Sequence, residues 1–527
     1  MARCLGTHRA CAESIGPKRL RLNRDVEQGE LCTARVSDRQ RVGLCGPTET
    51  CGPTETDGTT TMKHSANSEH SPSLDGGLAG RTSKPCRHAA GLRRRTFLVT
   101  ATAVAAPWFI PGRALGAEGA PPSERIRVGL IGYGRQTHVY NFKLFAREKD
   151  AEVVAVCEVD RWRLEQGKQA VEAFYSAQSN KAAFRGCSVY HDYRDLLGRT
   201  DIDAVMISTP DHWHVPMTLD AFAAGKDVAC EKPVNRSIAQ GRAVMAAAKK
   251  YGRVYRVDSE FRSLENFHRV AELVRGGAIG KLKRIVTGVP ASDDVECPPT
   301  PEMPVPEELD YDLWLGPAPK APYTENRVHA PKKFDRPGWM RILDYSDGII
   351  TNWGAHLNDI ALWAADKERT GPVEIRGRGV WPAPGKLWNV LRTFEVHYRF
   401  ADGLELIYKT DRPYARFEGE TGWIQADFPK KLEADPAGAL QAALPADTPR
   451  FPLKSEKRDF LDAVRSRGNT MEDAEVGHRV TSLCHLGHIA IHLGRELRWD
   501  PAAERFVDCP EADRYIDQPI TALPQRG

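Results

Sequence analysis

The fold of this chain is decided by the stretch Ile126–Gly134, which reads IRVGLIGYG. Its apolar first part predicts a buried strand, and Gly132 and Gly134 predict a tight turn where the backbone can approach a ligand closely. A strand that ends in such a turn before a helix is where a parallel sheet binds the pyrophosphate of a dinucleotide. We therefore predict a Rossmann-type dinucleotide-binding domain over residues 122–258.

The residues that follow the turn point to NAD. Thr137 stands where the third glycine of G-x-G-x-x-G would be, so the motif is weak without its context. Residues 151–157, AEVVAVC, predict a second buried strand that ends at Glu158. A carboxylate there accepts both adenosine ribose hydroxyls and repels a 2′-phosphate. Arg161 and Arg163 are close enough in sequence to serve a 2′-phosphate, so NADP stays open.

Strand-like and helix-like segments then alternate, which predicts a doubly wound parallel sheet. A strand over 203–210 leads into a loop at 211–214, a helix over 215–224 and a strand over 228–230. That strand runs into Glu231-Lys232-Pro233, and Lys232 would stand beside the nicotinamide. The residues predicted to contact the cofactor are Gly132, Gly134, Arg135, Glu158, Thr209, Pro210, His212, His214, Glu231 and Lys232.

With these motifs, the chain resembles the Gfo/Idh/MocA oxidoreductases (glucose–fructose oxidoreductase, inositol dehydrogenase and rhizopine-catabolism proteins). The resemblance covers about residues 122–505. It rests on the glycine turn Gly129–Gly134, the segment Thr209–His214 (TPDHWH), Gly225–Val228 (GKDV), Glu231–Pro233 (EKP) and Asn352–Asp359 (NWGAHLND). It implies a C-terminal α/β domain over 259–527 with a large open, mostly antiparallel sheet, and a homo-oligomer, either a dimer or a tetramer.

The second half agrees with that outline. Strand-like segments occupy 282–288, 393–400 and 404–408, and the last two flank the hairpin turn Ala401-Asp402-Gly403. Residues 289–337 are rich in proline and predict loops around a pocket. The aromatic residues Trp314, Tyr323 and Trp339, together with Arg341, would either contact a sugar or pack these loops. We take Trp339 and Arg341 as the substrate-binding candidates there.

His356 is the second candidate for acid/base chemistry. It opens a predicted helix, and Asp359 lies one turn later, where it could orient the imidazole ring or meet the substrate. The resemblance implies that a lysine, an aspartate and this histidine work together. Here Asn352 stands in place of the aspartate, and an amide can bond a hydroxyl but cannot take its proton. The predicted catalytic residues are therefore Lys232, His356 and Asn352.

Two groups of residues have spacings that could suit a metal ion. Asp211, His212 and His214 lie in the TPDHWH segment, and His485, His488 and His492 share one face of a predicted helix. Neither group has a further ligand at a suitable spacing. We therefore predict a nicotinamide pocket around the first group, a structural helix for the second, and no metal.

Composition limits the partners of the chain. Its 527 residues carry 74 Lys and Arg against 70 Asp and Glu, a net charge of +4 that lacks the basic excess of a nucleic-acid-binding protein. Length and 41% hydrophobic content allow two folded domains. The 12 cysteines show no disulfide framework or zinc pattern.

The N-terminal region predicts processing rather than a domain. Residues 1–92 are polar and contain the tandem repeat CGPTET-CGPTET, so we expect disorder or, with Met62 as the true start, a mis-assigned extension. Residues 93–117 combine Arg94 and Arg95 with a short apolar run, as in a twin-arginine export signal. That run is too short to span a membrane, so we predict a protein that is periplasmic or otherwise exported through the twin-arginine pathway, without stable membrane insertion.

Three functions fit these features. The first is an NAD(P)-dependent oxidoreductase that moves a hydride between the nicotinamide and a secondary alcohol of a sugar, cyclitol or glycoside. The second, which the resemblance allows, is an NAD-dependent glycosidase that cleaves by transient oxidation and elimination. The third is a non-catalytic sugar-binding or assembly protein, against which the presence of both Lys232 and His356 counts.

Overall fold

The computed structural model describes residues 124–179, 186–292, 297 and 300–521. The predicted extension at 1–92, the alternative start at Met62 and the export signal at 93–117 lie outside the described residues. Within the described ranges, no helix combines the length and the apolar character needed to cross a membrane.

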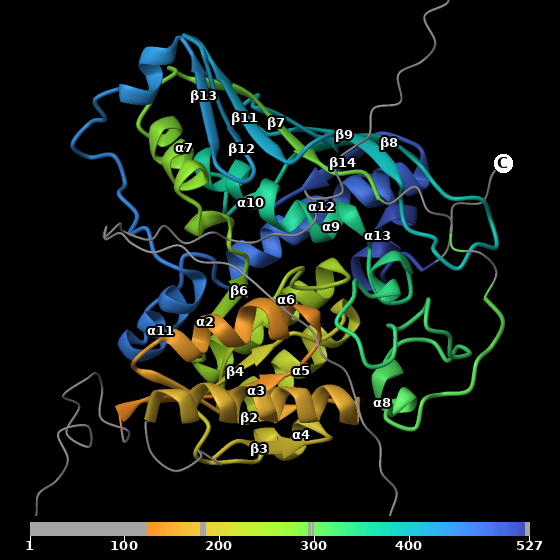
Figure 1. The fold of residues 1–527 in the computed structure, drawn as a ribbon. Helices are drawn as coiled ribbons and strands as arrows, with labels where there is room; N and C mark the ends of the chain where they lie inside the picture. The colour runs from red at the N-terminus through yellow and green to blue at the C-terminus, as the bar shows by residue number, and fades with distance from the viewer. Residues whose placement is uncertain (1–123, 180–185, 293–296, 298–299, 522–527) are drawn as a thin grey trace, which may run out of the picture. The chain divides into compact units, whose positions relative to one another are not determined.

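The first sheet is a six-stranded parallel sheet in the order β3-β2-β1-β4-β5-β6 (Figure 1). Its strands are β1 (Ile126–Ile131), β2 (Ala151–Cys157), β3 (Ser188–Tyr190), β4 (Ala204–Ile207), β5 (Asp227–Glu231) and β6 (Tyr255–Asp258). The order reverses between β1 and β4, and ligands of such sheets bind at that crevice, beyond the carboxyl ends of the strands. The predicted Rossmann sheet is confirmed.

Helices connect these strands, which is why their residues are buried. Val128, Val153 and Met206 have no exposed surface, because a parallel sheet carries its connecting helices on both faces. The connecting elements are η4 (Thr137–Asn141), α2 (Phe142–Arg147), α3 (Arg161–Ser179), α4 (Tyr193–Leu197), α5 (Asp211–Ala223) and α6 (Ile238–Tyr251).

Helix α5 begins earlier than its sequence suggests. Residues 211–214, predicted to form a loop, are the first turn of this helix. Pro210 precedes it with an extended backbone, and Asp211 lies in the first turn, where burial raises the pKa of its carboxyl. His212 and His214 are therefore helical and buried.

The second sheet has nine strands in the order β13-β12-β11-β7-β10-β9-β8-β14-β15. Only β7 and β10 pair in parallel, so the predicted mostly antiparallel sheet is confirmed. The strands are β7 (Leu282–Val289), β8 (Glu374–Val380), β9 (Thr393–Arg399), β10 (Glu405–Thr410), β11 (Tyr414–Gly419), β12 (Trp423–Asp427), β13 (Lys431–Asp435), β14 (Leu497–Asp500) and β15 (Arg505–Phe506).

One face of this sheet is covered by helices α7, α10 and α12 (Figure 1). Helix α12 also packs against α6, so it joins the two sheets. The helical elements of this half are η5 (Phe261–Ser263), α7 (Glu265–Arg275), α8 (Tyr311–Leu315), η6 (Gly338–Arg341), α9 (Ile349–Asn352), α10 (Gly354–Ala364), η7 (Ala437–Gln441), α11 (Glu456–Ser466), α12 (Ala474–Leu493) and α13 (Pro510–Asp517).

Helix α11 returns to the first sheet from late in the chain. Its Arg458 donates from Nη1 to Asp150 at 2.7 Å, and its Asp459 accepts from Nε of Arg256 in β6 at 3.0 Å. Residues 456–466 therefore help to build the Rossmann half, although more than 190 positions separate them from β6.

Candidate active site

The turn after β1 has the geometry that a pyrophosphate needs. Gly132 has φ +88°, and a Cβ added there would lie 2.7 Å from the carbonyl oxygen of Ser208, so only glycine fits. A Cβ added at Gly134 would meet only Nη1 of Arg163, at 3.8 Å. Thr137, which stands at the position of the motif's third glycine, donates its hydroxyl to the carbonyl of Gly132 at 2.7 Å. This hydrogen bond closes the turn.

Glu158 lies beside this turn. Its Oε2 accepts from the backbone N–H of Tyr133 at 2.8 Å, and its Oε1 accepts from Val159 at 2.8 Å. An ionised carboxylate has about four acceptor positions, so it retains capacity for a ribose hydroxyl. Arg135, the next predicted cofactor contact, is exposed beside the turn. The residues of the turn thus fit a dinucleotide.

Arg161 and Arg163, the two arginines that could bind the 2′-phosphate of NADP, form hydrogen bonds with other groups. Arg161 donates from Nη2 to the carbonyl of Glu307 at 2.5 Å. Arg163 donates from Nη2 to the carbonyl of Lys333 at 2.8 Å. Both therefore tie the Rossmann half to loops of the second half.

The histidines of the TPDHWH segment are engaged by main-chain carbonyls. The ring nitrogens of His214 lie 2.9 Å from the oxygen of Thr209 and 2.7 Å from that of Pro233, so this ring links the end of β4 to the end of β5. His212 Nε2 lies 3.2 Å from the oxygen of Trp314, and burial lowers the pKa of His212 to about 3.

The candidate metal ligands have other neighbours as well. His485 lies 3.1 Å from the carbonyl of Asn235, and His492 lies 3.0 Å from the hydroxyl of Tyr515. His488 stacks on Trp381 with ring centroids 5.4 Å apart. Within the described ranges, no three potential ligands gather closely enough to hold a metal ion.

The Glu231-Lys232-Pro233 segment ends β5 at the same edge of the sheet as the glycine turn. Glu231 accepts from Nδ2 of Asn141 at 3.0 Å, and Asn141 also donates to Oγ of Ser208 at 3.0 Å. Lys232 is half-buried, and among the described residues its amine has no hydrogen bond or ion pair. The hydrogen bonds of Asn141 hold Glu231 in place, and the amine of Lys232 remains available to bind a substrate.

His356, in the first turn of α10, is held as a neutral ring. Its Nδ1 lies 2.9 Å from the hydroxyl of Ser259, and the ring stacks on Phe261 with centroids 4.6 Å apart. Burial, and then the charge of Lys232, hold the pKa of His356 well below its usual value. Nε2 has no hydrogen-bond partner among the described residues, and it can accept a proton in the tautomer whose Nδ1–H donates to Ser259.

The predicted role of Asp359 is wrong. Its carboxylate accepts from Arg262, from Nε at 2.7 Å and from Nη2 at 2.5 Å, and has no exposed surface. Helical spacing places Asp359 one turn after His356, but a fully buried carboxylate requires a cation, and Arg262 supplies it. Ser259 takes the position beside the ring, and Asp359 is closed to a substrate.

The other substrate-binding candidates lie in a loop cluster of the second half. The guanidinium of Arg341 stands over the ring of Trp388 at 4.5 Å and donates to the carbonyl of Pro337 at 3.3 Å. Trp339 is half-buried against an apolar cluster that includes Trp314. Asn352 ends α9, is buried, and lies one helical turn before His356.

Several polar residues at the cofactor edge of the parallel sheet were not predicted from the sequence. Lys457 of α11 is fully buried, forms an ion pair with Asp258 and donates to Oδ1 of Asn141 at 3.0 Å. Glu260 lies two residues after Asp258, and its Oε2 is 3.8 Å from Nδ1 of His356. The polar residues at and just after the end of β6 were a signal for Asp258 and Glu260, because the carboxyl ends of parallel strands share one edge of the sheet. Nothing local identifies Lys457.

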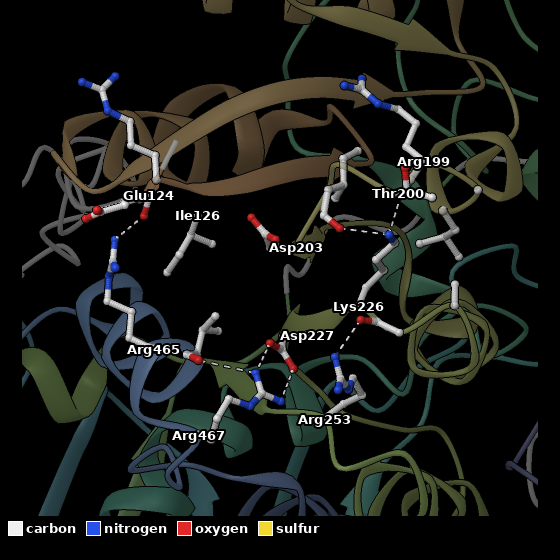
Figure 2. Close-up of a pocket in the computed structure, with 17 residues that line it drawn as sticks. Glu124, Ile126, Arg199, Thr200, Asp203, Lys226, Asp227, Arg253, Arg465 and Arg467 are labelled. Carbon is white, nitrogen blue, oxygen red and sulfur yellow. Dashed lines mark hydrogen bonds and ion pairs between the residues drawn. The ribbon is translucent and has the colours of Figure 1, made fainter. Parts of the chain in front are cut away.

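The large cavity in Figure 2 lies at the other end of the sheet. It has a volume of about 670 Å³ and is lined by residues at the starts of β1 and β5, such as Ile126 and Asp227. Its basic side chains already have partners: Arg467 binds Asp227 through two nitrogens, and Lys226 donates to two carbonyls. It does not adjoin the glycine turn, and we do not assign it to the cofactor.

Comparisons with known proteins agree with this geometry. The family model described as "Oxidoreductase family, NAD-binding Rossmann fold" matches residues 126–259. A second model, "Oxidoreductase family, C-terminal alpha/beta domain", matches residues 297–524. Together they span most of the described chain.

Similar solved structures include the aldose-aldose oxidoreductase from Caulobacter crescentus. It is 17% identical, has a TM-score of 0.53, and the match covers 71% of this chain and 99% of that one. The WlbA dehydrogenase from Bordetella pertussis, solved with NADH and UDP-GlcNAcA, is 16% identical with a TM-score of 0.50; the match covers 71% of this chain and 99% of that one. At these identities the likeness is one of fold.

Several similar curated sequences carry glycosidase names. The alpha-N-acetylgalactosaminidase of Shewanella oneidensis is 30% identical over 217 residues, which is 36% of this chain and 44% of that protein. Glycosyl hydrolase family 109 protein 2 of Shewanella sp. strain ANA-3 is 36% identical over 118 residues, 22% of this chain and 25% of that protein. The chain therefore spans between a quarter and less than half of the length of these relatives.

Proposed function

Because the chain belongs to the Gfo/Idh/MocA family of oxidoreductases, with an NAD-binding Rossmann domain and a C-terminal α/β domain, we propose that it is an NAD-dependent enzyme acting on a secondary alcohol of a sugar, cyclitol or glycoside. One observation carries this proposal. His356 contacts Ser259 just after β6 and so lies at the cofactor end of the sheet, where burial and then the charge of Lys232 lower its pKa. The Lys232 amine itself has no hydrogen bond or ion pair among the described residues.

In this reaction, side chains of the protein would accept the proton of the substrate's hydroxyl group. NAD held over the glycine turn would supply a hydride acceptor. Nε2 of His356 takes the hydroxyl proton, since the ring is neutral and its Nδ1 is held by Ser259. Lys232 donates a hydrogen bond to the same oxygen and stabilises its negative charge. Asn352 would bond a neighbouring hydroxyl without taking its proton.

The choice of NAD over NADP is supported by the charges near Glu158. That carboxylate would repel a 2′-phosphate. Arg161 and Arg163, the nearby cations that could attract one, donate to the carbonyls of Glu307 and Lys333. Binding of NAD with little affinity for NADP is the expected outcome.

A redox-assisted glycosidase is the second candidate. It is favoured by the similarity to the alpha-N-acetylgalactosaminidase of Shewanella oneidensis, which is 30% identical over 217 residues, 36% of this chain. The same residues would serve it, because oxidation of a ring carbon makes the neighbouring C–H acidic and permits elimination of the aglycone. Such an enzyme regenerates its own NAD.

We further propose a homo-oligomer. The face of the nine-stranded sheet opposite α7, α10 and α12 presents alternating polar side chains, including cross-strand pairs such as Arg284–Glu418 and Arg378–Glu395. A second copy could pair with this face. Light scattering coupled to gel filtration, with a monomer mass as the contrary result, tests it.

One experiment separates the candidates. The purified protein is denatured to release and identify its nucleotide, and is then incubated with NAD and a panel of sugars, cyclitols and nitrophenyl glycosides. NADH accumulation supports the dehydrogenase, and glycoside cleavage without net reduction supports the glycosidase. If neither occurs with NAD bound, the protein is a binding or assembly module and our proposal fails.

A further inference from the structure

Glu260 is a carboxylate at the active-site edge to which the reaction above assigns no role. It follows β6, so it shares the edge of the sheet that holds the glycine turn and Lys232. Its Oε2 lies 3.8 Å from Nδ1 of His356. The His356 side chain is 7% exposed and that of Glu260 is 26% exposed, so both are largely buried and the carboxylate is less buried than the ring.

His356 needs a negative charge when it reacts. Its pKa is held well below the usual value by burial and by the charge of Lys232, so the protonated ring is unfavourable where it stands. An opposite charge within about 4–6 Å favours the charged form of a group. Asn352, one helical turn before the ring, is neutral, and Asp359 is bound to Arg262. Glu260 is the remaining carboxylate in contact with the ring.

We propose that Glu260 is the counter-charge of His356 and stabilises the imidazolium that forms when Nε2 takes the substrate's hydroxyl proton. This inference rests on the proposed function. The O–H bond breaks toward Nε2 while the hydride of the same carbon goes to oxidised nicotinamide, which leaves a ketone and an imidazolium–carboxylate pair. Because Glu260 acts through His356, it is a positioning residue.

The charge of Glu260 depends on pH near neutrality. Burial raises the pKa of Glu260 to about 7, and the charges of Glu456 and Glu231 add to this effect, whereas Lys232 opposes it. The groups that face Glu260 are Lys232, Glu231, Glu456, Tyr140 and His356. Since the pKa is raised, the counter-charge is present above about pH 7 and is lost as pH falls below it.

Titration of the nucleotide-free protein tests the contact without any substrate. With ¹⁵N-labelled histidine, and His356→Gln to assign the signal, the ring nitrogens of His356 should show an inflection near pH 7 as Glu260 ionises. Glu260→Gln should abolish that inflection, and Glu260→Asp, which keeps a carboxylate, should retain one. Glu265→Gln, an exposed carboxylate five positions later, is the matched control and should change nothing.

Kinetics test the consequence. Glu260→Gln should lower kcat above pH 7 by about 10- to 100-fold with KM nearly unchanged, since an opposite charge at this separation favours the protonated ring by about that factor. The rise of wild-type kcat through pH 7 should disappear. Adding Asn352→Asp should restore part of kcat, because it places a carboxylate four positions before the ring, across the junction of α9 and α10.

The inference is overturned if Glu260→Gln keeps the inflection, or keeps the wild-type kcat and its pH profile. The proposed function fails differently. If wild-type protein turns over no alcohol but the inflection vanishes in Glu260→Gln, the electrostatic contact stands and the assigned chemistry is wrong.

Discussion

Replacing Gly134 with valine tests whether the turn after β1 binds a pyrophosphate. A Cβ at this position meets only Nη1 of Arg163, at an ordinary contact distance of 3.8 Å, and the backbone is outside the left-handed region. The fold should therefore lose only about 0.5 kcal/mol of stability, as for substitutions away from packed groups. Any larger effect must come from the ligand.

The loss of affinity can be worked from that geometry. A branched side chain would occupy the space through which a phosphate approaches the backbone N–H groups. Removing one or two charge-assisted hydrogen bonds costs about 3 to 4 kcal/mol in total. The Kd for NAD should then rise by about 100- to 1000-fold.

Calorimetric titration of nucleotide-free protein with NAD measures this change, and thermal unfolding checks the fold. Gly132→Ala is the contrasting variant, because its Cβ would lie 2.7 Å from the Ser208 oxygen at φ +88°. It should destabilise the fold by about 1–3 kcal/mol whether or not NAD is present. A folded Gly134→Val protein that binds NAD with wild-type affinity would refute the assignment of the turn.

Three further outcomes are expected. Lys232→Ala and His356→Ala should each lower turnover by about two to four decades with NAD binding nearly intact. The double variant should be little worse than the poorer single variant. Full activity in His356→Ala would show that this ring has a structural role only. Changing Arg94 and Arg95 to lysine should leave the precursor in the cytoplasm by immunoblot, and normal export would reject the signal. Asp359→Asn should lower the free energy of unfolding by about 3 kcal/mol in denaturant titration, since it breaks a buried ion pair; a lower kcat without lost stability would restore its predicted role beside His356.

Much of the fold follows from local signals. The run Ile126–Ile131 became β1, and 151–157 became β2, because continuous apolar segments are stable as strands only when both faces are buried. The glycine turn after β1 is a backbone requirement that no other residue meets at Gly132. Such features depend on neighbours in sequence, so the sequence alone determines them.

Predictions from local sequence were wrong at two places where tertiary packing determines the structure. The loop predicted at 211–214 is the first turn of α5. His212 and Trp213 in this turn lie against the carbonyl oxygen of Trp314 in the second half, a contact that the sequence does not reveal. Asp359 has the spacing of a partner for His356. Its charge is instead paired with Arg262, 97 positions earlier, because a buried carboxylate takes the cation that the surrounding elements present.

The electrostatics of the site were decided by tertiary structure. Lys457 meets Asp258 across 199 positions, and Ser259 meets His356 across 97. No periodicity or motif encodes such pairs, since they depend on how α10 and α11 pack near the end of β6. The sequence alone identified Lys232 and His356 as candidate catalytic residues, because each lies in a recognisable motif. Only the folded chain buries His356 and brings the charge of Lys232 near it, which together lower the pKa of His356. The folded chain also places Glu260 beside that ring, because Coulomb interactions depend on distance in space and not along the chain.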